Sequence, residues 1–295
     1  MQHQYLDPHI LAHLPKNVEL IAKRLVQGMF VGYHRSPFFG TSVEFADHRQ
    51  YYPGDELRTM DWRVWAKHDR YCIKRFMMES QLKATILLDC STSMDFRSNG
   101  LSKLEYGCYL AASLSYLIIH QNDMAGLVSF DDTIRDYLPP RGSRAHMRSI
   151  LHALERLKTG PQTNVARICH HLAETMRARG MIILISDLLD TDYTRPLRVL
   201  SQRHDLTAIT LSDPRESELP DVGFIQLRDA ETGHQVLVDT SDARLREQFA
   251  GNQRAAAEAR SEGLRRLGVD EIRIDTTRSY IEPLVRHFRS RARRH

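Results

Sequence analysis

The residues best suited to chemistry lie in one short stretch, LLDCSTSMDF. Asp89 ends an apolar run and is followed by Ser91 and Ser93, so a carboxylate and two hydroxyls recur at alternate positions. Two later positions offer oxygen atoms in similar settings, namely Thr163 in GPQTN and Asp187 in ILISDLLD. Together these side chains supply two carboxylates and three hydroxyls, with no sulfur and no imidazole.

An oxygen-only set of this kind suits a hard divalent cation. Mg²⁺ takes about six oxygen ligands in octahedral geometry, keeps some of its water and is commonly held by one or two carboxylates. Serine hydroxyls ligate while neutral, so the ion keeps positive charge at its open position. The sequence therefore predicts a weak Mg²⁺ or Mn²⁺ site, with Ca²⁺ as a further alternative, that a carboxylate from a partner protein completes.

Each of these residues also has a purely structural interpretation. Asp89 could accept backbone N–H groups of its own loop, and the two serines could form a turn. Thr163 or Asn164 could be an ordinary helix N-cap, and Asp187 could cap a helix that begins near residue 191. The joint placement of the five residues at strand ends favours the metal site over these separate explanations.

The elements that must position these residues alternate between strand and helix after about residue 83. Such alternation indicates an α/β protein of Rossmann-like type, with a mostly parallel sheet and helices on both faces. In such sheets, ligands bind beyond the carboxyl ends of the strands. We predict strands at 83–89, 124–130, 134–138, 180–187, 204–213 and 270–276, of which 134–138 is an antiparallel edge strand. We predict helices at 103–120, 143–157, 164–178, 195–203, 241–267 and from 279. The first of these helices begins after a capping box formed by Ser102 and Glu105.

Two domains are predicted from this pattern. Residues 83–295 form the main domain, with an inserted β-hairpin near 219–240. Residues 1–82 begin with a helix at 16–30 and continue as an irregular segment rich in aromatic and charged residues, including Trp62 and Trp65. Because this segment lacks clean periodicity, we expect it to pack on the main domain.

Composition narrows the function classes. Of the 295 residues, 42% are hydrophobic and 26% are charged, as in ordinary globular proteins, and no apolar run is long enough to span a membrane. The N-terminus lacks the pattern of a secretory signal. The four cysteines show no C-x-x-C spacing, which is typical of reduced, mostly buried thiols and predicts a cytoplasmic protein.

Enzymatic and nucleic-acid functions are weaker alternatives. The chain contains no G-x-S-x-G elbow, no P-loop and no H-E-x-x-H motif. A phosphoaspartate enzyme would carry a second carboxylate two residues after the first, where Ser91 stands. A Mg²⁺-dependent phosphoester hydrolase stays open, with Asp95 or Asp190 as general base. Only the basic C-terminal RHFRSRARRH favours nucleic acid as a ligand. Nucleic acid is nevertheless an unlikely ligand, because the net charge is only +4. We therefore predict a protein that is not an enzyme.

Two resemblances add to this reading. The DCSTS motif, followed by Thr163 and Asp187, resembles the metal-ion-dependent adhesion site of von Willebrand factor type A domains, although Leu188 stands where a glycine is frequent. Nearly the whole chain resembles the domain-of-unknown-function 58 (DUF58) family. One segment that carries this resemblance is SDPRESELPDVGFIQLRD. The family hallmark is GTSVEFADHRQYYPGDELRTMDWRVWAK, with Glu44, Phe45, Arg49, Tyr51, Gly54, Asp55, Arg58, Asp61 and Trp62 in the expected pattern.

The family resemblance implies a partner and a role. Members are usually encoded beside a MoxR-type AAA+ ATPase and are thought to act with it as adaptors in chaperone-like assembly, maturation or metal insertion. The hallmark segment has no established chemistry, and we expect its Arg, Asp and Trp residues to form buried salt bridges and an aromatic core between the domains.

Overall fold

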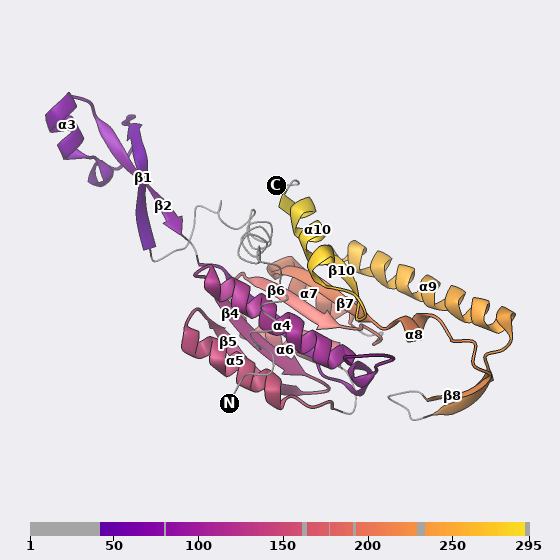
Figure 1. Cartoon of the computed structure of the whole chain (residues 1–295). Helices are drawn as coiled ribbons and strands as arrows, with labels where there is room; N and C mark the ends of the chain where they lie inside the picture. Colours follow the sequence, from indigo (N-terminus) through magenta and orange to yellow (C-terminus); the bar gives the residue numbers. More distant parts are fainter. Residues whose placement is uncertain are drawn as a thin grey trace. The chain divides into compact units, whose positions relative to one another are not determined.

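The computed structural model describes residues 42–79, 81–160, 164–176, 178–190, 193–228 and 234–292 (Figure 1). The chain divides into two compact units, with a boundary in the sequence between Gln81 and Leu82, and each unit is described by itself. The predicted helix at 16–30 lies outside the described residues, as does Thr163.

The larger unit is built on a six-stranded sheet. Its strands are β3 (Lys83–Asp89), β4 (Met124–Phe130), β5 (Ile134–Arg141), β6 (Met181–Ser186), β7 (Asp205–Ser212) and β10 (Asp270–Asp275). They lie in the order β10-β7-β6-β3-β4-β5, and only the β4–β5 pair is antiparallel. The predicted mostly parallel sheet and its antiparallel edge strand are confirmed. That edge strand, β5, carries Pro139 and Pro140.

Helices cover both faces of this sheet, which explains why its central strands are continuous apolar runs. On one face lie α4 (Lys103–His120), α5 (Arg144–Arg156) and α10 (Ile281–Ala292), and on the other lie α6 (Val165–Thr175) and α7 (Thr194–Arg203). The last turn of α9 (Ala243–Arg266) adds Leu264 to the hydrophobic core on the face covered by α6 and α7. Every residue of β6 is buried, as expected of a central strand.

The predicted hairpin is confirmed as a separate two-stranded sheet of β8 (Phe224–Arg228) and β9 (Gln235–Asp239). In Figure 1 it lies apart from the six-stranded sheet, at the start of α9. A short helix that the sequence analysis did not predict, α8 (Pro214–Ser217), connects β7 to the hairpin region.

The smaller unit has more regular structure than we predicted. β1 (Ser42–Gln50) pairs antiparallel with β2 (Cys72–Glu79), and a short helix, α3 (Trp62–His68), lies between them in sequence after a 3₁₀ turn, η2 (Leu57–Thr59). For residues 42–79, the expectation of an irregular segment was therefore wrong. A register shift between Phe45 and Asp47 interrupts the two-residue alternation of β1, which hides the strand from a periodicity argument.

The family hallmark forms polar contacts within this unit. Arg49 pairs with Asp55 at 2.7 Å, and His48 contacts Asp61 at 2.8 Å. The side chain of Asp61 also caps α3. Trp62 is 57% exposed and Trp65 is 38% exposed, so the tryptophans form no buried core within the unit. Their packing on the main domain stays a prediction.

Two predictions from composition can be compared with the structure. The four cysteines are free, and three of them are buried, as predicted. Within the described ranges, no helix is both long enough and apolar enough to cross a membrane.

Candidate functional site

The candidate site lies where the strand order of the sheet reverses. From β3 the chain passes to β4 on one side, and it later returns to β6 on the other side. Loops diverge at such a switch point and leave room for a ligand beyond the carboxyl ends of the strands. Asp89 is the last residue of β3 and Asp187 directly follows β6, so the sheet brings these two carboxylates to the same place.

The loop after β3 is held by the carboxylate of Asp89. One oxygen, Oδ1, accepts the N–H of Ser91 at 3.0 Å, and Oδ2 accepts the hydroxyl of Ser186 at 2.6 Å. The hydroxyls of Ser91 and Ser93 lie 3.0 Å apart. Asp89 and Ser91 are completely buried and Ser93 is 6% exposed, so these oxygens lie just beneath the surface.

Backbone contacts fix the same loop to its neighbours. The Cys90 N–H donates to the Phe130 carbonyl at 2.7 Å, and the Gly160 N–H donates to the Cys90 carbonyl at 2.7 Å. The Thr92 hydroxyl donates to the Gly160 carbonyl at 2.6 Å. The loop is thus bonded on one side to the end of β4 and on the other to the segment after α5.

Gly160 is required at its position by a close approach. A Cβ atom there would lie 1.7 Å from Oδ2 of Asp131, which is a steric overlap. Asp131 cannot easily move away, because its carboxylate accepts from the Thr133 N–H at 2.9 Å and from Arg135 Nε at 2.6 Å. The Asp131 side chain is fully buried beneath the loop.

A buried lysine contacts Asp187. Lys103 is the first residue of α4, and its ammonium donates to Asp187 Oδ2 at 2.8 Å and to Glu216 Oε1 at 2.5 Å. The Lys103 side chain is 0% exposed, Asp187 is 4% exposed and Glu216 is 27% exposed. Phe96 lies under the ammonium, with its ring centroid 6.0 Å away.

Two capping boxes hold the partners of this contact in place. At the start of α4, Ser102 and Glu105 exchange hydrogen bonds of 3.1 and 2.8 Å, as the sequence predicted. At the start of α8, the other oxygen of Glu216 accepts the N–H of Asp213 at 3.1 Å. Lys103 and Glu216 therefore approach each other from two fixed helix ends.

Burial dominates the electrostatics of Asp89. Loss of hydration, followed by the nearby charge of Asp187, raises the pKa of Asp89 to about 6, although the hydrogen bonds from Ser186 and Ser91 act in the opposite direction. Burial, then the charges of Asp131 and Asp89, raises the pKa of the Cys90 thiol to about 12, so this cysteine is not a nucleophile at neutral pH.

The donor set fits a divalent cation. Two oxygens at right angles around Mg²⁺, each 2.0–2.1 Å from it, lie about 2.9 Å apart. The 3.0 Å separation of the Ser91 and Ser93 hydroxyls matches that spacing, and the same separation lets them hydrogen-bond to each other without metal. Within the described residues, no group of three or more His, Cys, Asp or Glu side chains is arranged to hold a metal, so a cation here needs the hydroxyls.

Leu188, which directly follows Asp187, has an unusual backbone conformation. Its φ is +50°, a left-handed conformation that favours glycine. The Leu188 N–H donates to the Ser186 hydroxyl at 2.9 Å, and its side chain is 3% exposed in the core under α6 and α7. Burial of the Leu188 side chain thus offsets the strain of its left-handed backbone conformation.

Of the five predicted ligands, Asp89, Ser91 and Ser93 are linked by hydrogen bonds, and Asp187 lies near enough to Asp89 for its charge to raise the pKa of Asp89. Thr163 lies outside the described residues. Asn164 is the N-cap of α6, as one structural interpretation proposed. Asp187 does not cap the next helix, whose N-cap residue is Tyr193.

Sequence reasoning missed Ser186, Lys103, Glu216 and Asp131. One signal was present for Lys103: a cation in the first turn of a mostly buried helix opposes the helix dipole and therefore needs acidic partners.

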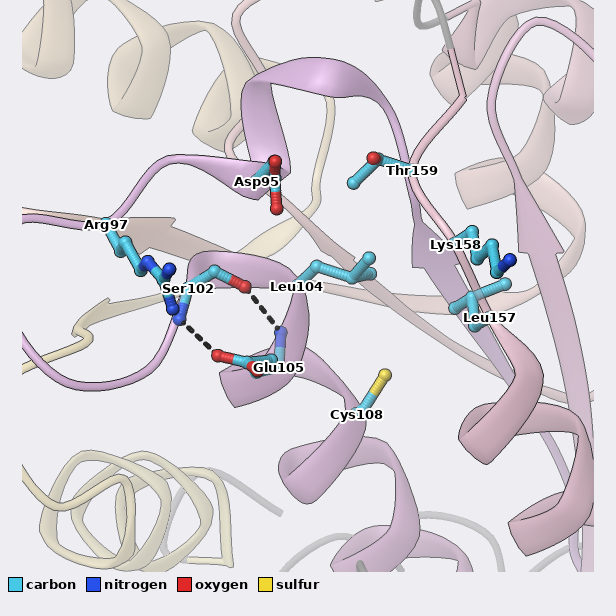
Figure 2. Close-up of a pocket in the computed structure, with 9 residues that line it drawn as sticks. All are labelled: Asp95, Arg97, Ser102, Leu104, Glu105, Cys108, Leu157, Lys158 and Thr159. Carbon is cyan, nitrogen blue, oxygen red and sulfur yellow. Dashed lines mark hydrogen bonds between the residues drawn. The ribbon is translucent and has the colours of Figure 1, made fainter.

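A cavity of about 520 Å³ adjoins the loop that carries Ser93. Figure 2 shows its lining, in which side chains from the end of η3 (Thr92–Asp95), the start of α4 and the segment after α5 surround the space. It is lined by Asp95, Arg97, Ser102, Leu104, Glu105, Cys108, Leu157, Lys158 and Thr159. Charged groups of both signs therefore border the candidate site.

The doubly wound, mostly parallel sheet, with its antiparallel edge strand and inserted hairpin, defines an α/β protein of Rossmann-like type. The chain belongs to the DUF58 family, because the family described as "Protein of unknown function DUF58" matches residues 47–260.

The chain is similar in sequence to one further protein, and a comparison with solved structures adds two more. Uncharacterized protein Rv1480 of Mycobacterium tuberculosis is 32% identical over 295 residues, covering 97% of this chain and 91% of the relative. The hypothetical protein BatB from Bacteroides thetaiotaomicron is 16% identical with a TM-score of 0.46, covering 72% of this chain and 99% of BatB. A von Willebrand factor type A structure from Catenulispora acidiphila is 11% identical with a TM-score of 0.38, covering 87% of this chain and 51% of the other.

Proposed function

We propose that the protein is a non-enzymatic interaction module that binds a divalent cation, Mg²⁺ or Mn²⁺, and presents it to a partner protein. The observation that carries this proposal is the meeting of Asp89 and Asp187 with the paired hydroxyls of Ser91 and Ser93 at the switch point of the sheet. Hard oxygen donors of this number and charge are the ligands that Mg²⁺ prefers.

The proposed ligands would contribute two kinds of oxygen to the ion. Asp89 supplies a buried carboxylate that the loop already orients, and Ser91 and Ser93 supply neutral oxygens. Asp187 supplies the second carboxylate, and Thr163 is the further ligand expected from the sequence. When bound, the ion would offer a positive charge that attracts a carboxylate oxygen of the partner.

The family suggests a candidate for that partner. DUF58 membership supports a MoxR-type AAA+ ATPase as the protein engaged, with this chain as its adaptor in assembly, maturation or metal insertion. A pull-down with the wild type and Asp89→Asn identifies the partner as the protein that the variant loses.

Calorimetric titration with Mg²⁺ or Mn²⁺ tests the metal site. The wild type should bind the ion with measurable heat, and Asp89→Asn should not, because the amide keeps the side-chain shape but removes the charge. Asp95→Asn is the matched control, since Asp95 lies in the same loop, is exposed and is not a proposed ligand.

Equal binding by the wild type and Asp89→Asn would remove the proposed site. Loss of binding in Asp95→Asn alone would place the cation in the neighbouring cavity instead.

The cavity favours a second candidate function, a metal-dependent phosphoester hydrolase. Asp95, the candidate general base, lines this space together with the cationic side chains of Arg97 and Lys158 (Figure 2). A panel of phosphoesters with Mg²⁺ separates the two functions, since only the hydrolase gives turnover that Asp95→Asn abolishes.

A further inference from the structure

Lys103 places a positive charge directly on one of the proposed metal ligands. Its ammonium lies 2.8 Å from Asp187 Oδ2 and 2.5 Å from Glu216 Oε1, and no part of its side chain is exposed. A lysine side chain is rarely buried completely unless it is paired with acidic groups.

The contacts of Lys103 are those of an ammonium group. Two carboxylates lie within hydrogen-bond distance of its nitrogen, and opposite charges at this range attract. The start of α4 adds the positive end of a helix dipole, so the two carboxylates are what keeps the ammonium there.

A divalent cation that is coordinated by Asp187 competes with the Lys103 ammonium for this carboxylate. Both cations need the same carboxylate, and at such short range in a buried site like charges repel strongly. Glu216 makes the exchange feasible, because Lys103 keeps a carboxylate partner on α8 when Asp187 turns to the metal.

We propose that Lys103 determines the metal affinity of the site by competing with the divalent cation for Asp187. The proposal rests on the metal-binding function proposed above and specifies how this chain regulates it. Without metal, the lysine balances the charge of Asp187, so the empty site is stable. With metal, Lys103 keeps its contact with Glu216, and its nearby positive charge lowers the affinity of the site for the ion.

The experiment compares the wild type with Lys103→Met and with Lys83→Met. Both variants lose one positive charge, but Lys83 is an exposed residue at the opposite end of β3 from Asp89 and serves as the matched control. The measurements are the Mg²⁺ affinity by calorimetry and the thermal unfolding midpoint with EDTA and with Mg²⁺.

Lys103→Met should bind Mg²⁺ at least about tenfold more tightly than the wild type. Its unfolding midpoint should fall in EDTA and recover in Mg²⁺, whereas Lys83→Met should match the wild type in both measurements. If Lys103→Met yields no folded protein, Lys103→Gln carries the same test, because its amide can still donate to Asp187 without a charge.

The outcomes separate this inference from the proposed function. Unchanged or weaker Mg²⁺ binding by Lys103→Met, beside a wild type that binds, would overturn the competition while the metal site stands. Binding by Lys103→Met alone would support the competition and refute metal binding by the natural protein. No binding by either protein would overturn both.

Discussion

Asp89 is a carboxylate with no contact to bulk water, and this has a measurable effect on stability. Its pKa is about 6 in the folded protein against 3.8 for an ordinary aspartate, mainly because burial disfavours the charged form. Between these two values the folded chain binds more protons at this position than the unfolded chain. The free energy of unfolding must therefore fall as the pH rises from about 4 to about 6.

Asp89→Asn should remove this pH dependence. Above pH 6 the ionised side chain costs the metal-free protein about 3 kcal/mol, from a shift of roughly two pKa units. We expect the variant to be more stable than the wild type by about 2 kcal/mol at pH 7.5 in EDTA, after allowing for weaker hydrogen bonds. Urea unfolding at pH 4.5 and pH 7.5 measures the effect.

A wild type that is more stable than Asp89→Asn in EDTA at pH 7.5 would show that the buried charge is compensated. In Mg²⁺ the order should reverse, because only the wild type gains the binding free energy of the ion.

At the residue scale, the sequence predicted the two aspartates of the site but not the partners of Asp187. Both aspartates were identified from their positions after apolar strands, since the fold fixes where strand ends lie. The partner of Asp187 was not identified, because Lys103 and Glu216 reach the site from α4 and α8. Their approach depends on tertiary packing that no local pattern encodes.

At the scale of elements, the site depends on how closely the β3 loop approaches the segment after α5. The only side chain that fits at position 160 is a hydrogen atom, because Asp131 fills the space beyond it. Gly160→Ala should lower the free energy of unfolding by about 1–3 kcal/mol, the usual cost of overpacking. It should also weaken Mg²⁺ binding, since Thr92 is bonded to Gly160.

Gly251→Ala is the control for this substitution. Gly251 lies in α9 and a Cβ atom there meets nothing within 4 Å, so alanine should stabilise the helix by about 0.5–1 kcal/mol. Chemical denaturation of the two variants checks the pair. If Gly160→Ala were as stable as the wild type, the loop would have room to shift.

Elements were predicted well where periodicity and packing agree. From residue 83 onward, the strands and helices other than α8 lie where the alternation of apolar runs and amphipathic stretches placed them, since two covered faces impose strong patterns. β1 and α3 were missed because a bulge and an exposed aromatic surface leave no regular apolar stripe. The contacts of Thr163 stay a prediction.

At the scale of the whole molecule, stability should be unevenly distributed. β6 is buried along its full length between two strands, whereas the β8–β9 hairpin has only two strands and exposes Phe224 and Leu237. An isolated hairpin of this kind is marginally stable in water. Hydrogen exchange should therefore be slowest for the amides of β6 and fastest for those of the hairpin.

This prediction is checked by mass spectrometry of peptides after exchange. Protection of the hairpin comparable to that of β6 would mean that a second molecule or another part of the same chain covers it. Repeating the measurement across a range of protein concentrations distinguishes self-association, which depends on concentration, from protection within one chain.

The prolines of β5 have a consequence for solutions of this protein. An outermost strand normally offers free N–H groups to which a strand of another molecule can add, which is a common start of fibrous aggregation. Because successive N–H groups of a strand point to opposite sides, the consecutive Pro139 and Pro140 remove one donor from this rim. Addition of a further strand at β5 should therefore be hindered.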